Sequence, residues 1–325
     1  MPKIYLAGTP VAGTPVAGTP LGDQEFVVQP DSNLLDALLE HGHKVPWSCR
    51  SGHCQSCLVQ ARPDEAPSAA RSLLSPEQQS KGWLLACQCL VQQDMHISLH
   101  DPTTDGLPAR ISEMRYLADD ILLLRLAPER PLRFRAGQHL VLWLDASLAR
   151  PYSIASLPAD GELAFHLRLH AQGAFSNAIR QCQLGDRLYL GSAAGHFHYD
   201  PAWQDTPLLM LGSGTGLAPL QAIARDALLA GHEAPITVWH WSRADTPCYL
   251  TQPLLKLADQ YPQLRLHLRS RAELPSDLTQ LRLASRKTLA LLCGPPAFIE
   301  QLRKPLFMAG LPGRQILDEA FISRQ

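Results

Sequence analysis

Four cysteines are the residues of this chain whose type and spacing most directly indicate chemistry. Cys49, Cys54 and Cys57 form the pattern C-x4-C-x2-C, and Cys87 follows after 29 further residues. Thiolates at this spacing are typical of a [2Fe–2S] cluster, which moves one electron at a time. The alternatives are a zinc site or reduced structural cysteines, but zinc sites usually pair one C-x2-C with a second such pair or with two histidines. Here the second half offers only Cys87 and Cys89, and Cys87 is the favoured fourth ligand.

The first hundred residues also contain the elements that would position these cysteines. Short strands are expected at Lys3–Ala7 and Glu25–Val28, and a helix is expected around Ser32–His41, capped by Asp31 or Ser32. The cysteine loop follows that helix. This segment resembles plant-type ferredoxins. The resemblance implies a β-grasp domain, over residues 1–100, in which the four cysteines bind the cluster.

A short repeat interrupts the start of this module. AGTPV stands at Ala7–Val11 and again at Ala12–Val16, and AGTPL follows at Ala17–Leu21. Removing ten residues would leave an ordinary first hairpin. We therefore interpret residues 7–21 as an expanded turn between the first two strands, with a binding role as the alternative. A segment so rich in Gly, Thr and Pro cannot bury a core of its own.

A second module follows a proline-bearing linker at residues 101–108. Between residues 109 and 204, short apolar strands alternate with Gly, Pro and Asp turns, a pattern typical of an antiparallel β-barrel. The module contains the sequence Arg150-Pro151-Tyr152-Ser153, and Gly173-Ala174-Phe175-Ser176 follows it. The two motifs resemble the R-x-Y-S and G-x-x-S signatures of the ferredoxin–NADP reductase family.

That resemblance implies a flavin, with FAD preferred to FMN. Arg150 would pair with a flavin phosphate through its planar guanidinium. The Tyr152 ring would pack on the isoalloxazine, and Ser153 would hydrogen-bond the N5 edge, where hydride arrives. The second motif, Gly173 to Ser176, and the helix expected after it at Asn177–Cys182 would receive the pyrophosphate.

The third module, residues 205–325, has the pattern strand, Gly-rich loop and helix. The strand Leu208–Leu211 leads into Gly212-Ser213-Gly214-Thr215-Gly216, and the helix continues to Leu229. Glycines permit a tight turn and close approach of a pyrophosphate to the helix N-terminus. The form G-x-G-x-G-x-x-P resembles the nucleotide site of the same reductase family. It implies a Rossmann-like α/β domain that binds NAD(P)H, with a bare Gly-rich turn as the alternative.

Three later positions complete the predicted site. Arg243 follows the strand Ile236–Trp241 and would contact the adenosine ribose. NADH is preferred and NADPH stays open, because Asp245 is only a candidate for an acidic residue that would mark NADH. Cys293-Gly294-Pro295 resembles the turn beside the nicotinamide, although Cys293 would also suit a buried apolar position. Phe321 would cover the flavin face as a gate, or would fill a gap in the core. Ser153, Cys293 and Phe321 are thus the predicted catalytic residues.

Composition excludes several classes of function. Residues 1–105 hold 6 basic and 11 acidic residues, a net charge of −5, and the remainder holds 23 and 19, a net charge of +4. With an overall charge of −1, the chain lacks the basic field that nucleic-acid binding requires. Eight cysteines without a secretory signal favour a reducing, cytoplasmic location. No apolar run is long enough to span a membrane. The histidines lack metal spacing and are expected in solvated or core positions.

The order of modules indicates the function. Ferredoxin, flavin and nucleotide modules in series resemble the reductase components of bacterial multicomponent oxygenases. They also resemble the reductase of 3,6-dideoxyhexose synthesis, which acts with a CDP-6-deoxy-3,4-glucoseen dehydratase. The resemblance implies an oxidoreductase that passes electrons from NAD(P)H through FAD and the cluster to a separate soluble acceptor protein. An oxygenase component is the preferred acceptor, and it would be a separate protein because this chain carries neither a Rieske nor a di-iron motif. Another soluble acceptor, or a non-catalytic redox sensor, is the alternative.

Overall fold

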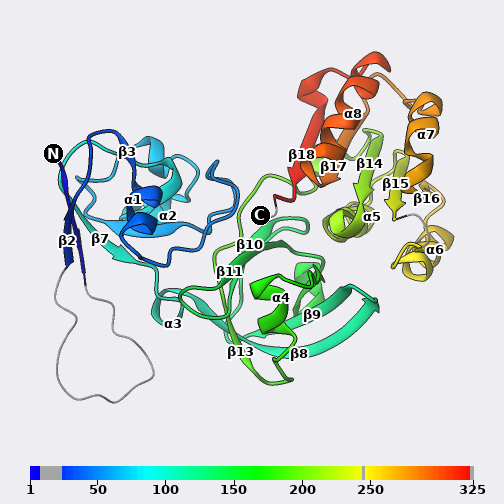
Figure 1. Ribbon diagram of the computed structural model, residues 1–325. Helices are drawn as coiled ribbons and strands as arrows, with labels where there is room; N and C mark the ends of the chain where they lie inside the picture. The colour runs from blue at the N-terminus through cyan, green and yellow to red at the C-terminus, as the bar shows by residue number, and fades with distance from the viewer. Residues whose placement is uncertain (8–23, 244–245, 323–325) are drawn as a thin grey trace.

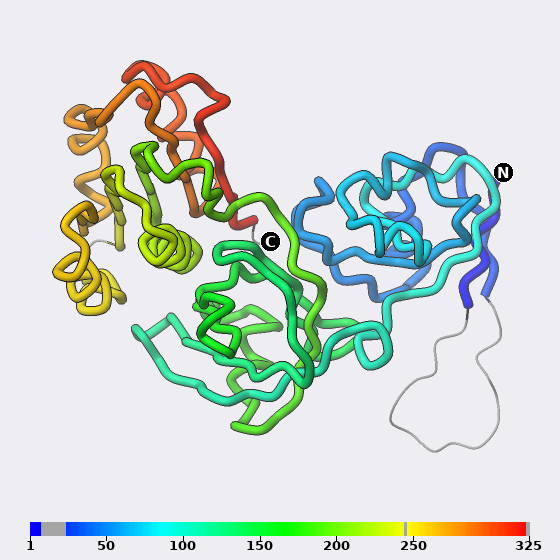
Figure 2. Tube along the Cα trace, turned by 180° about the vertical axis from the view of Figure 1, so that it is seen from behind, coloured from blue at the N-terminus to red at the C-terminus, as the bar shows by residue number. Residues whose placement is uncertain are grey.

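A computed structural model of the chain describes residues 1–7, 24–243 and 246–322. Three domains follow one another along the chain, as the sequence predicts (Figure 1). The middle domain lies between the other two, and the end of the described chain reaches the centre of the molecule, as the reverse view also shows (Figure 2). Among the described residues, no helix is long and apolar enough to cross a membrane.

The first domain is a five-stranded mixed sheet covered by helix α1 (Leu34–Glu40). Its strands take the order β2-β1-β7-β4-β5, and β1 and β7 pair in parallel. Leu34, Leu35 and Leu38 are fully buried on α1, which fixes the helix against the sheet. The strands and the second helix are β1 (Lys3–Leu6), β2 (Gln24–Val27), β4 (Leu58–Ala61), α2 (Pro76–Ser80), β5 (Trp83–Leu85) and β7 (Met95–Leu99).

The start of α1 differs from the prediction. The helix begins at Leu34, and its cap is Asn33, whose side chain accepts hydrogen bonds from Leu35 N at 3.1 Å and Asp36 N at 3.4 Å. Ser32 and Asn33 form the short strand β3, which pairs with β6 (Leu90–Val91) and therefore cannot be helical. Of the repeat at residues 7–21, all but Ala7 lie outside the described residues.

The second domain is a six-stranded antiparallel sheet with the order β11-β10-β13-β8-β9-β12. The segment after β11 meets β12 through the Ala155 N to Ala164 O hydrogen bond of 2.7 Å, and Ala164 N donates to Ser156 Oγ at 3.0 Å. These bonds bring the two edges together, which is the device that removes free edges from a barrel. The elements are β8 (Leu107–Ala118), β9 (Ile121–Pro128), β10 (His139–Trp143), β11 (Ala149–Ser153), β12 (Leu163–Arg168), α4 (Ala174–Ile179) and β13 (Arg187–Leu190).

Two local features of this domain differ from the expectation. The segment 101–108 contains the short helix α3 (Pro102–Asp105), whose first turn is capped by Asp101, and β8 begins at Leu107. Helix α4 begins at Ala174 and not at Asn177, because Gly173 is its cap and the Asn177 amide already donates to Gly173 O at 2.8 Å.

The third domain is a five-stranded parallel sheet with the order β16-β15-β14-β17-β18. The order reverses between β14 and β17, so the carboxyl ends of these two strands border the crevice in which such sheets bind nucleotides. The elements are β14 (Leu208–Ser213), α5 (Leu217–Leu229), β15 (Ile236–Ser242), α6 (Thr251–Gln260), β16 (Leu264–Ser270), α7 (Leu274–Gln280), β17 (Leu289–Gly294), α8 (Pro296–Met308) and β18 (Ile316–Ala320).

Candidate redox site at the meeting of three domains

The four predicted cluster cysteines lie together as two pairs. A thiol hydrogen bond joins Cys54 to Cys49 and lowers the pKa of Cys49 to about 4. A second joins Cys57 to Cys87 and lowers the pKa of Cys87 to about 7. Within residues 1–7, 24–243 and 246–322, no three histidine, cysteine or acidic side chains gather closely enough to hold a single metal ion. Two cysteine pairs, one for each iron, match the four-cysteine ligand set of a [2Fe–2S] cluster.

The neighbouring Cys89 has a different environment. Its side chain is fully buried in the domain core, where its sulfur contacts the Met95 sulfur at 4.0 Å, and burial raises its pKa to about 12. Cys87 instead lies beside the cysteine loop. Its backbone carbonyl accepts a hydrogen bond from Asn33 Nδ2 at 3.0 Å, which holds its segment in place. The cap of α1 thus also anchors the segment that carries Cys87. This geometry favours Cys87 as the fourth ligand.

The cysteine loop has an unusual backbone. Gly52 has a φ of +84°, and a Cβ at this position would lie 2.8 Å from a Leu73 methyl carbon. Arg50 and Gln55 also take positive φ values of 54° and 53°, which side-chain-bearing residues adopt at a cost. The Cys54 amide and the Ser51 amide point at the Cys49 sulfur, at 3.3 and 3.4 Å. Amides aimed at sulfur are the contacts that tune a cluster's potential.

The predicted flavin motif lies on β11. The Arg150 guanidinium Nη1 donates to the Ala149 carbonyl at 2.7 Å, and the Tyr152 and Phe175 ring centroids are 5.4 Å apart. Burial raises the pKa of Tyr152 well above its ordinary value, although the Arg150 charge opposes the shift. An aromatic ring beside a guanidinium suits a flavin, because the ring can pack on the isoalloxazine and the guanidinium can pair with the phosphate.

The second flavin motif is in contact with the loop before it. Ser176 is buried in the first turn of α4, and its hydroxyl accepts from the His170 amide at 3.0 Å. Gly173 leaves only 3.0 Å between its Cβ position and the Ser176 hydroxyl, so a larger residue would displace that serine. The motif therefore holds its own loop in place beside β12.

The glycine-rich loop and the end of β17 touch each other closely. A Cβ on Gly216 would lie 2.2 Å from the Cys293 carbonyl oxygen, and one on Gly212 would lie 2.8 Å from a Leu220 methyl carbon. Thr215 stands between the last two glycines, in the turn that leads into α5. Gly214 takes a φ of +59°. The loop thus places backbone amides at the start of α5, as pyrophosphate binding requires.

Cys293 and Phe321 border the same crevice. Cys293 is fully buried in the core between β14 and α5, and burial raises its pKa well above the ordinary value. Gly294 and Pro295 follow, and Pro295 caps α8. The Phe321 amide donates to the Gly294 carbonyl at 2.8 Å, and its half-buried ring packs against the core cluster that contains Cys293. Both proposed roles of Phe321, gate and core, are compatible with this position.

A charged cluster surrounds the predicted Arg243. This side chain pairs with Asp120 at 3.2 Å, and Asp120 also pairs with Arg168. The Arg168 guanidinium in turn lies 3.2 Å from the Cβ position of Gly214. The turn between β8 and β9 thus brings a carboxylate and a second cation to the nucleotide loop. Asp245, the other candidate at this end, lies outside the described residues.

The three domains meet around the end of β18. Ser153 Oγ donates to Glu319 Oε1 at 3.0 Å, and Glu319 is the register partner of Cys293. The ring of His139, on β10, lies 3.5 Å from the same carboxylate oxygen. Its other nitrogen lies 2.9 Å from the carbonyl of His53, in the cysteine loop. The predicted flavin, nicotinamide and cluster residues are therefore joined by direct contacts.

Comparisons with known proteins agree with this arrangement. Residues 18–92 match the 2Fe-2S iron-sulfur cluster binding domain, and residues 108–199 match the oxidoreductase FAD-binding domain. The ferredoxin–NAD(P)+ reductase component of the naphthalene 1,2-dioxygenase system of Pseudomonas putida is 30% identical, over 91% of this chain and 98% of that protein. The chain belongs to the family of ferredoxin–NAD(P)+ reductase components. This reductase is an NAD(P)H-dependent oxidoreductase with a [2Fe–2S] cluster and FAD.

Two further similarities bear on the reductase. A CDP-6-deoxy-L-threo-D-glycero-4-hexulose-3-dehydrase reductase of Yersinia pestis is 29% identical, over 61% of this chain and 62% of that protein. The ferredoxin reductase in carbazole 1,9a-dioxygenase has the same fold, with a TM-score of 0.61, 21% identity, and coverage of 99% of this chain and 98% of that one.

Several residues of the reductase site carry no signal that sequence reasoning recognised. His139 and Glu319 lie next to motifs, but their contacts join residues far apart in the chain. Asp120, in the turn between β8 and β9, and Arg168, at the end of β12, belong to no recognised motif. Two adjacent aspartates in the turn before β9 were the available sequence signal, but such pairs are too common to identify a coenzyme site.

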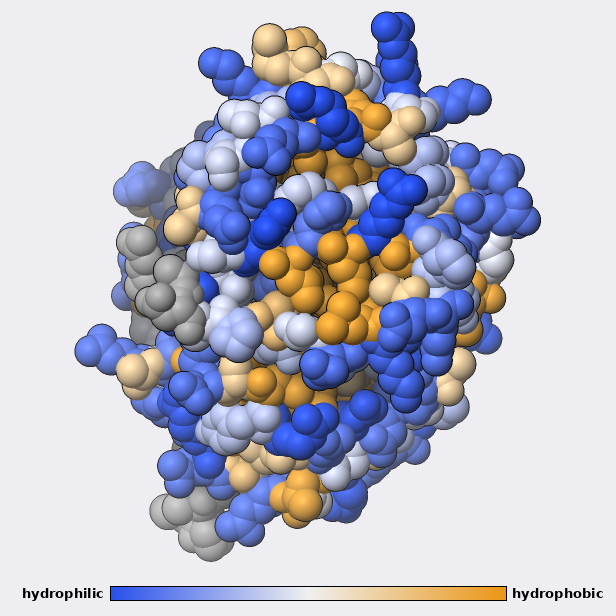
Figure 3. Space-filling model, turned by 90° about the vertical axis from the view of Figure 1, so that its right-hand side faces the viewer, coloured by the Kyte–Doolittle hydropathy of each residue, from blue (hydrophilic) through white to orange (hydrophobic). Residues whose placement is uncertain are grey.

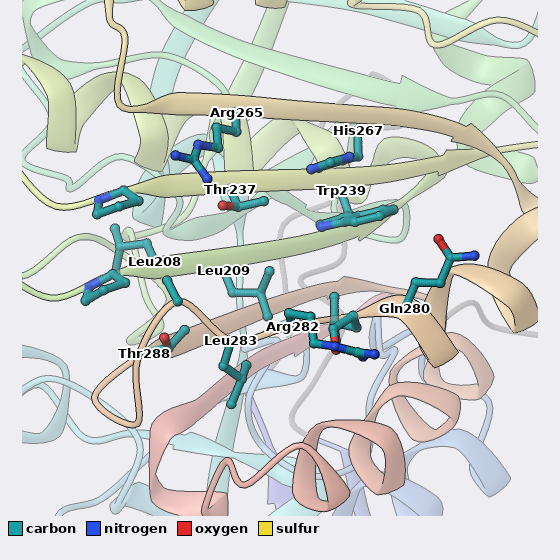
Figure 4. A pocket seen from close by; sticks show the side chains of 14 residues that line it. Leu208, Leu209, Thr237, Trp239, Arg265, His267, Gln280, Arg282, Leu283 and Thr288 are labelled. Atoms are coloured by element: carbon teal, nitrogen blue, oxygen red, sulfur yellow. The ribbon is translucent and has the colours of Figure 1, made fainter.

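A surface pocket of the reductase lies away from this site. It has a volume of about 320 Å³ and lies across the sheet of the nucleotide domain, where Thr237 and Trp239 of β15 lie beside Arg265 and His267 of β16 (Figure 4). Leu208, at the opposite end of β14 from the glycine loop, lines it. The face of the molecule on this side shows apolar residues gathered among polar ones (Figure 3). The pocket is therefore not part of the redox site.

Proposed function

We propose that this reductase takes electrons from NADH and delivers them to the oxygenase component of a multicomponent oxygenase. The observation that carries the proposal is the set of contacts from Ser153 through Glu319 and His139 to His53, which joins the three predicted sites. A relative that this chain matches over nearly the full length of both proteins is named as a reductase component of a dioxygenase system.

The residues have separate tasks in this proposal. Cys49 and Cys54 hold one iron, and Cys57 and Cys87 hold the other. Arg150, Tyr152, Gly173 and Ser176 bind FAD, and the glycine loop from Gly212 to Gly216 binds the coenzyme pyrophosphate. When bound, the flavin accepts a two-electron hydride and passes electrons singly to the cluster. The protein contributes orientation and exclusion of water.

The hydroxyl of Ser153 has a defined orientation in this site. It donates to the Glu319 carboxylate, so its oxygen lone pairs face away from that group. Cys293 and Phe321 border the place proposed for the nicotinamide, beside the loop at Gly294 and Pro295. Phe321 covers the flavin face until the coenzyme binds, which excludes water from the reacting atoms.

The coenzyme preference follows from the Asp120 cluster. Arg243 is the cation that would meet a 2′-phosphate, but it is paired with Asp120. Asp120 would repel a 2′-phosphate, and the ribose hydroxyl of NADH meets no such penalty. We therefore propose NADH as the preferred coenzyme, with NADPH used less well.

We also propose a cytoplasmic location. All eight cysteines lie in the described part of the chain and none forms a disulfide. Four of them are assigned to the cluster, and the other four, Cys89, Cys182, Cys248 and Cys293, would be kept as thiols in a reducing compartment.

Replacing one cluster ligand tests the series arrangement. The Cys54→Ser variant is expected to lose NADH-driven cytochrome c reduction and to keep ferricyanide reduction, which draws electrons from the flavin. The measurement is both steady-state rates in folded protein whose flavin content is unchanged. Equal loss of both rates would refute the arrangement.

A second measurement tests the acceptor. The reductase, reduced by NADH, is mixed with the purified oxygenase component from its own host, and substrate-dependent oxygen uptake is followed. Uptake that requires all components supports the proposal. A reductase for a deoxysugar dehydratase system is the second candidate, favoured by the Yersinia pestis relative. Turnover with the dehydratase, and none with the oxygenase component, would establish that alternative.

A further inference from the structure

The backbone of His139 is fixed firmly in the middle domain. It is the first residue of β10, and its register partner on β11 is Ser153. Its amide donates to the Ala194 carbonyl at 3.1 Å and its carbonyl accepts from the Ala194 amide at 2.8 Å. Gly195 has a φ of +94°, and a Cβ there would lie 2.9 Å from His139 Nδ1. The absence of a side chain at Gly195 therefore leaves room for the imidazole ring.

The two nitrogens of this ring face two other domains. Nε2 lies 2.9 Å from the His53 carbonyl of the ferredoxin domain, and a carbonyl only accepts, so Nε2 carries a proton. Nδ1 lies 3.5 Å from Glu319 Oε1 of the nucleotide domain, an ion-pair distance without good hydrogen-bond alignment. The side chains are only 11% and 16% exposed, so water screens the pair weakly.

The charges around the ring favour its protonated form. Burial opposes the positive charge, but the Glu319 carboxylate and the His53 carbonyl outweigh burial and raise the pKa of His139. Glu319 also accepts the Ser153 hydroxyl, which keeps its carboxylate oriented toward the ring. The doubly protonated imidazole donates from Nε2 to the His53 carbonyl and places its positive charge beside the Glu319 carboxylate, so one side chain contacts both neighbouring domains.

The partner on the ferredoxin side is the cysteine loop itself. His53 directly precedes Cys54, and the loop takes positive φ values on both sides of it, at Arg50 and Gln55. Ser48, just before Cys49, donates to the Ile322 carbonyl at 2.9 Å, so a second bond reaches the loop from the end of β18. The start and the middle of the cysteine loop are thus each held by a hydrogen bond to another domain.

We propose that His139 is the positioning residue that holds the cluster loop against the flavin site, through its hydrogen bond to His53 and its ion pair with Glu319. The inference rests on the proposed function, because it assigns the two sites that His139 joins. It differs from the solvated or core role expected of the histidines from sequence. Loss of this contact would let the ferredoxin domain move away from the middle domain while each domain stays folded.

The test compares His139→Leu with His139→Gln in the full-length protein that contains its cluster and FAD. Leucine fills the space but donates no hydrogen bond, whereas the Gln amide reaches the same region as Nε2 and donates to the His53 carbonyl. The matched control is His232→Leu, because His232 is equally buried but bonds to Tyr199 Oη, at 3.2 Å, inside the nucleotide domain core.

Two readouts are measured. The first is amide hydrogen exchange of residues 49–57, which reports docking without turnover. The second is the ratio of cytochrome c to ferricyanide reduction. In His139→Leu we expect exchange of the loop to rise about tenfold and the ratio of cytochrome c to ferricyanide reduction to fall about tenfold. In His139→Gln we expect most of both effects to be restored. The control variant, His232→Leu, should lower Tm and leave both the loop exchange and the reduction ratio unchanged.

Some results would overturn the assignment. Loop exchange and the ratio within twofold of the parent protein in His139→Leu would exclude a positioning role, and so would a Gln variant no better than Leu. If the leucine variant does not fold, His139→Ala, which also removes the Nε2 donor, takes its place with the same two readouts and the same deciding outcomes. Failure of the proposed series arrangement is distinguishable, because Cys54→Ser would then lose cytochrome c and ferricyanide reduction equally.

Discussion

The contact between the glycine loop and the end of β17 supports a sharp prediction. In Gly216→Ala, the new Cβ would lie 2.2 Å from the Cys293 carbonyl oxygen, and contacts under 3.0 Å essentially do not occur. Gly216 has a φ of −59°, so backbone strain is not involved. The loop and β17 must separate by about 0.8 Å, which widens the crevice proposed to hold the nicotinamide.

The cost has two parts. Overpacking of this kind lowers the free energy of unfolding by about 1–3 kcal/mol. A displacement approaching 1 Å at a reacting centre lowers kcat/KM by up to roughly 10²-fold. We therefore expect ferricyanide reduction to lose about 30–100-fold in kcat/KM for NADH. FAD content should be unchanged, because the flavin motifs are on other elements.

Gly313→Ala is the matched control. It is in the same domain, and a Cβ there meets nothing within 4 Å. The measurements are stopped-flow kinetics at varied NADH concentration and thermal unfolding, each made on both variants. If Gly216→Ala retains the kcat/KM and Tm of Gly313→Ala, the inferred close contact between Gly216 and the Cys293 carbonyl is refuted.

Five other substitutions have defined outcomes. Cys89→Ser should keep the visible absorption and reduced-state EPR signal of the cluster, and Cys87→Ser should lose them; the reverse pattern would exchange the assignment. Arg150→Ala should lose flavin on gel filtration, and full retention of FAD would contradict the phosphate contact. Asp120→Asn should shift kcat/KM toward NADPH by about 1 kcal/mol, roughly fivefold, after allowance for solvent screening; no shift would remove Asp120 from coenzyme selection. Phe321→Ala should change the KM for NADH and the flavin spectrum with little loss of stability, whereas a loss of about 3–5 kcal/mol without spectral change would indicate a core residue.

The parts of the fold that sequence reasoning predicted are those encoded locally. The cysteine spacing, the Arg150 motif and the glycine loop each need only a few adjacent residues to form a turn and present donors. The strand Leu208–Ser213 and helix α5 are apolar runs with a clear glycine boundary, so their positions followed from pattern.

Other features depend on pairing between distant segments. Asn33 caps α1 because Ser32 is held by β6, and the sequence near residue 33 carries no trace of residues 90–91. The His139 to His53 contact spans 86 positions, and the Arg243 to Asp120 contact spans 123. A single sequence does not show which distant histidine or carboxylate will face a motif, because many candidates of the same type are present.

The bonds from β18 give the order of synthesis a role in assembly. Ser48 and Ser153 are made early, yet their partners Ile322 and Glu319 are in the last segment that the structure describes. The ferredoxin and middle domains can fold while the nucleotide domain is still being made. A polypeptide that stopped before Glu319 would keep the four cluster cysteines, the flavin motif and the glycine loop. Its domains would lack these interdomain hydrogen bonds. The contacts that connect the cofactor sites can therefore form only after the residues proposed to hold the cofactors have been made.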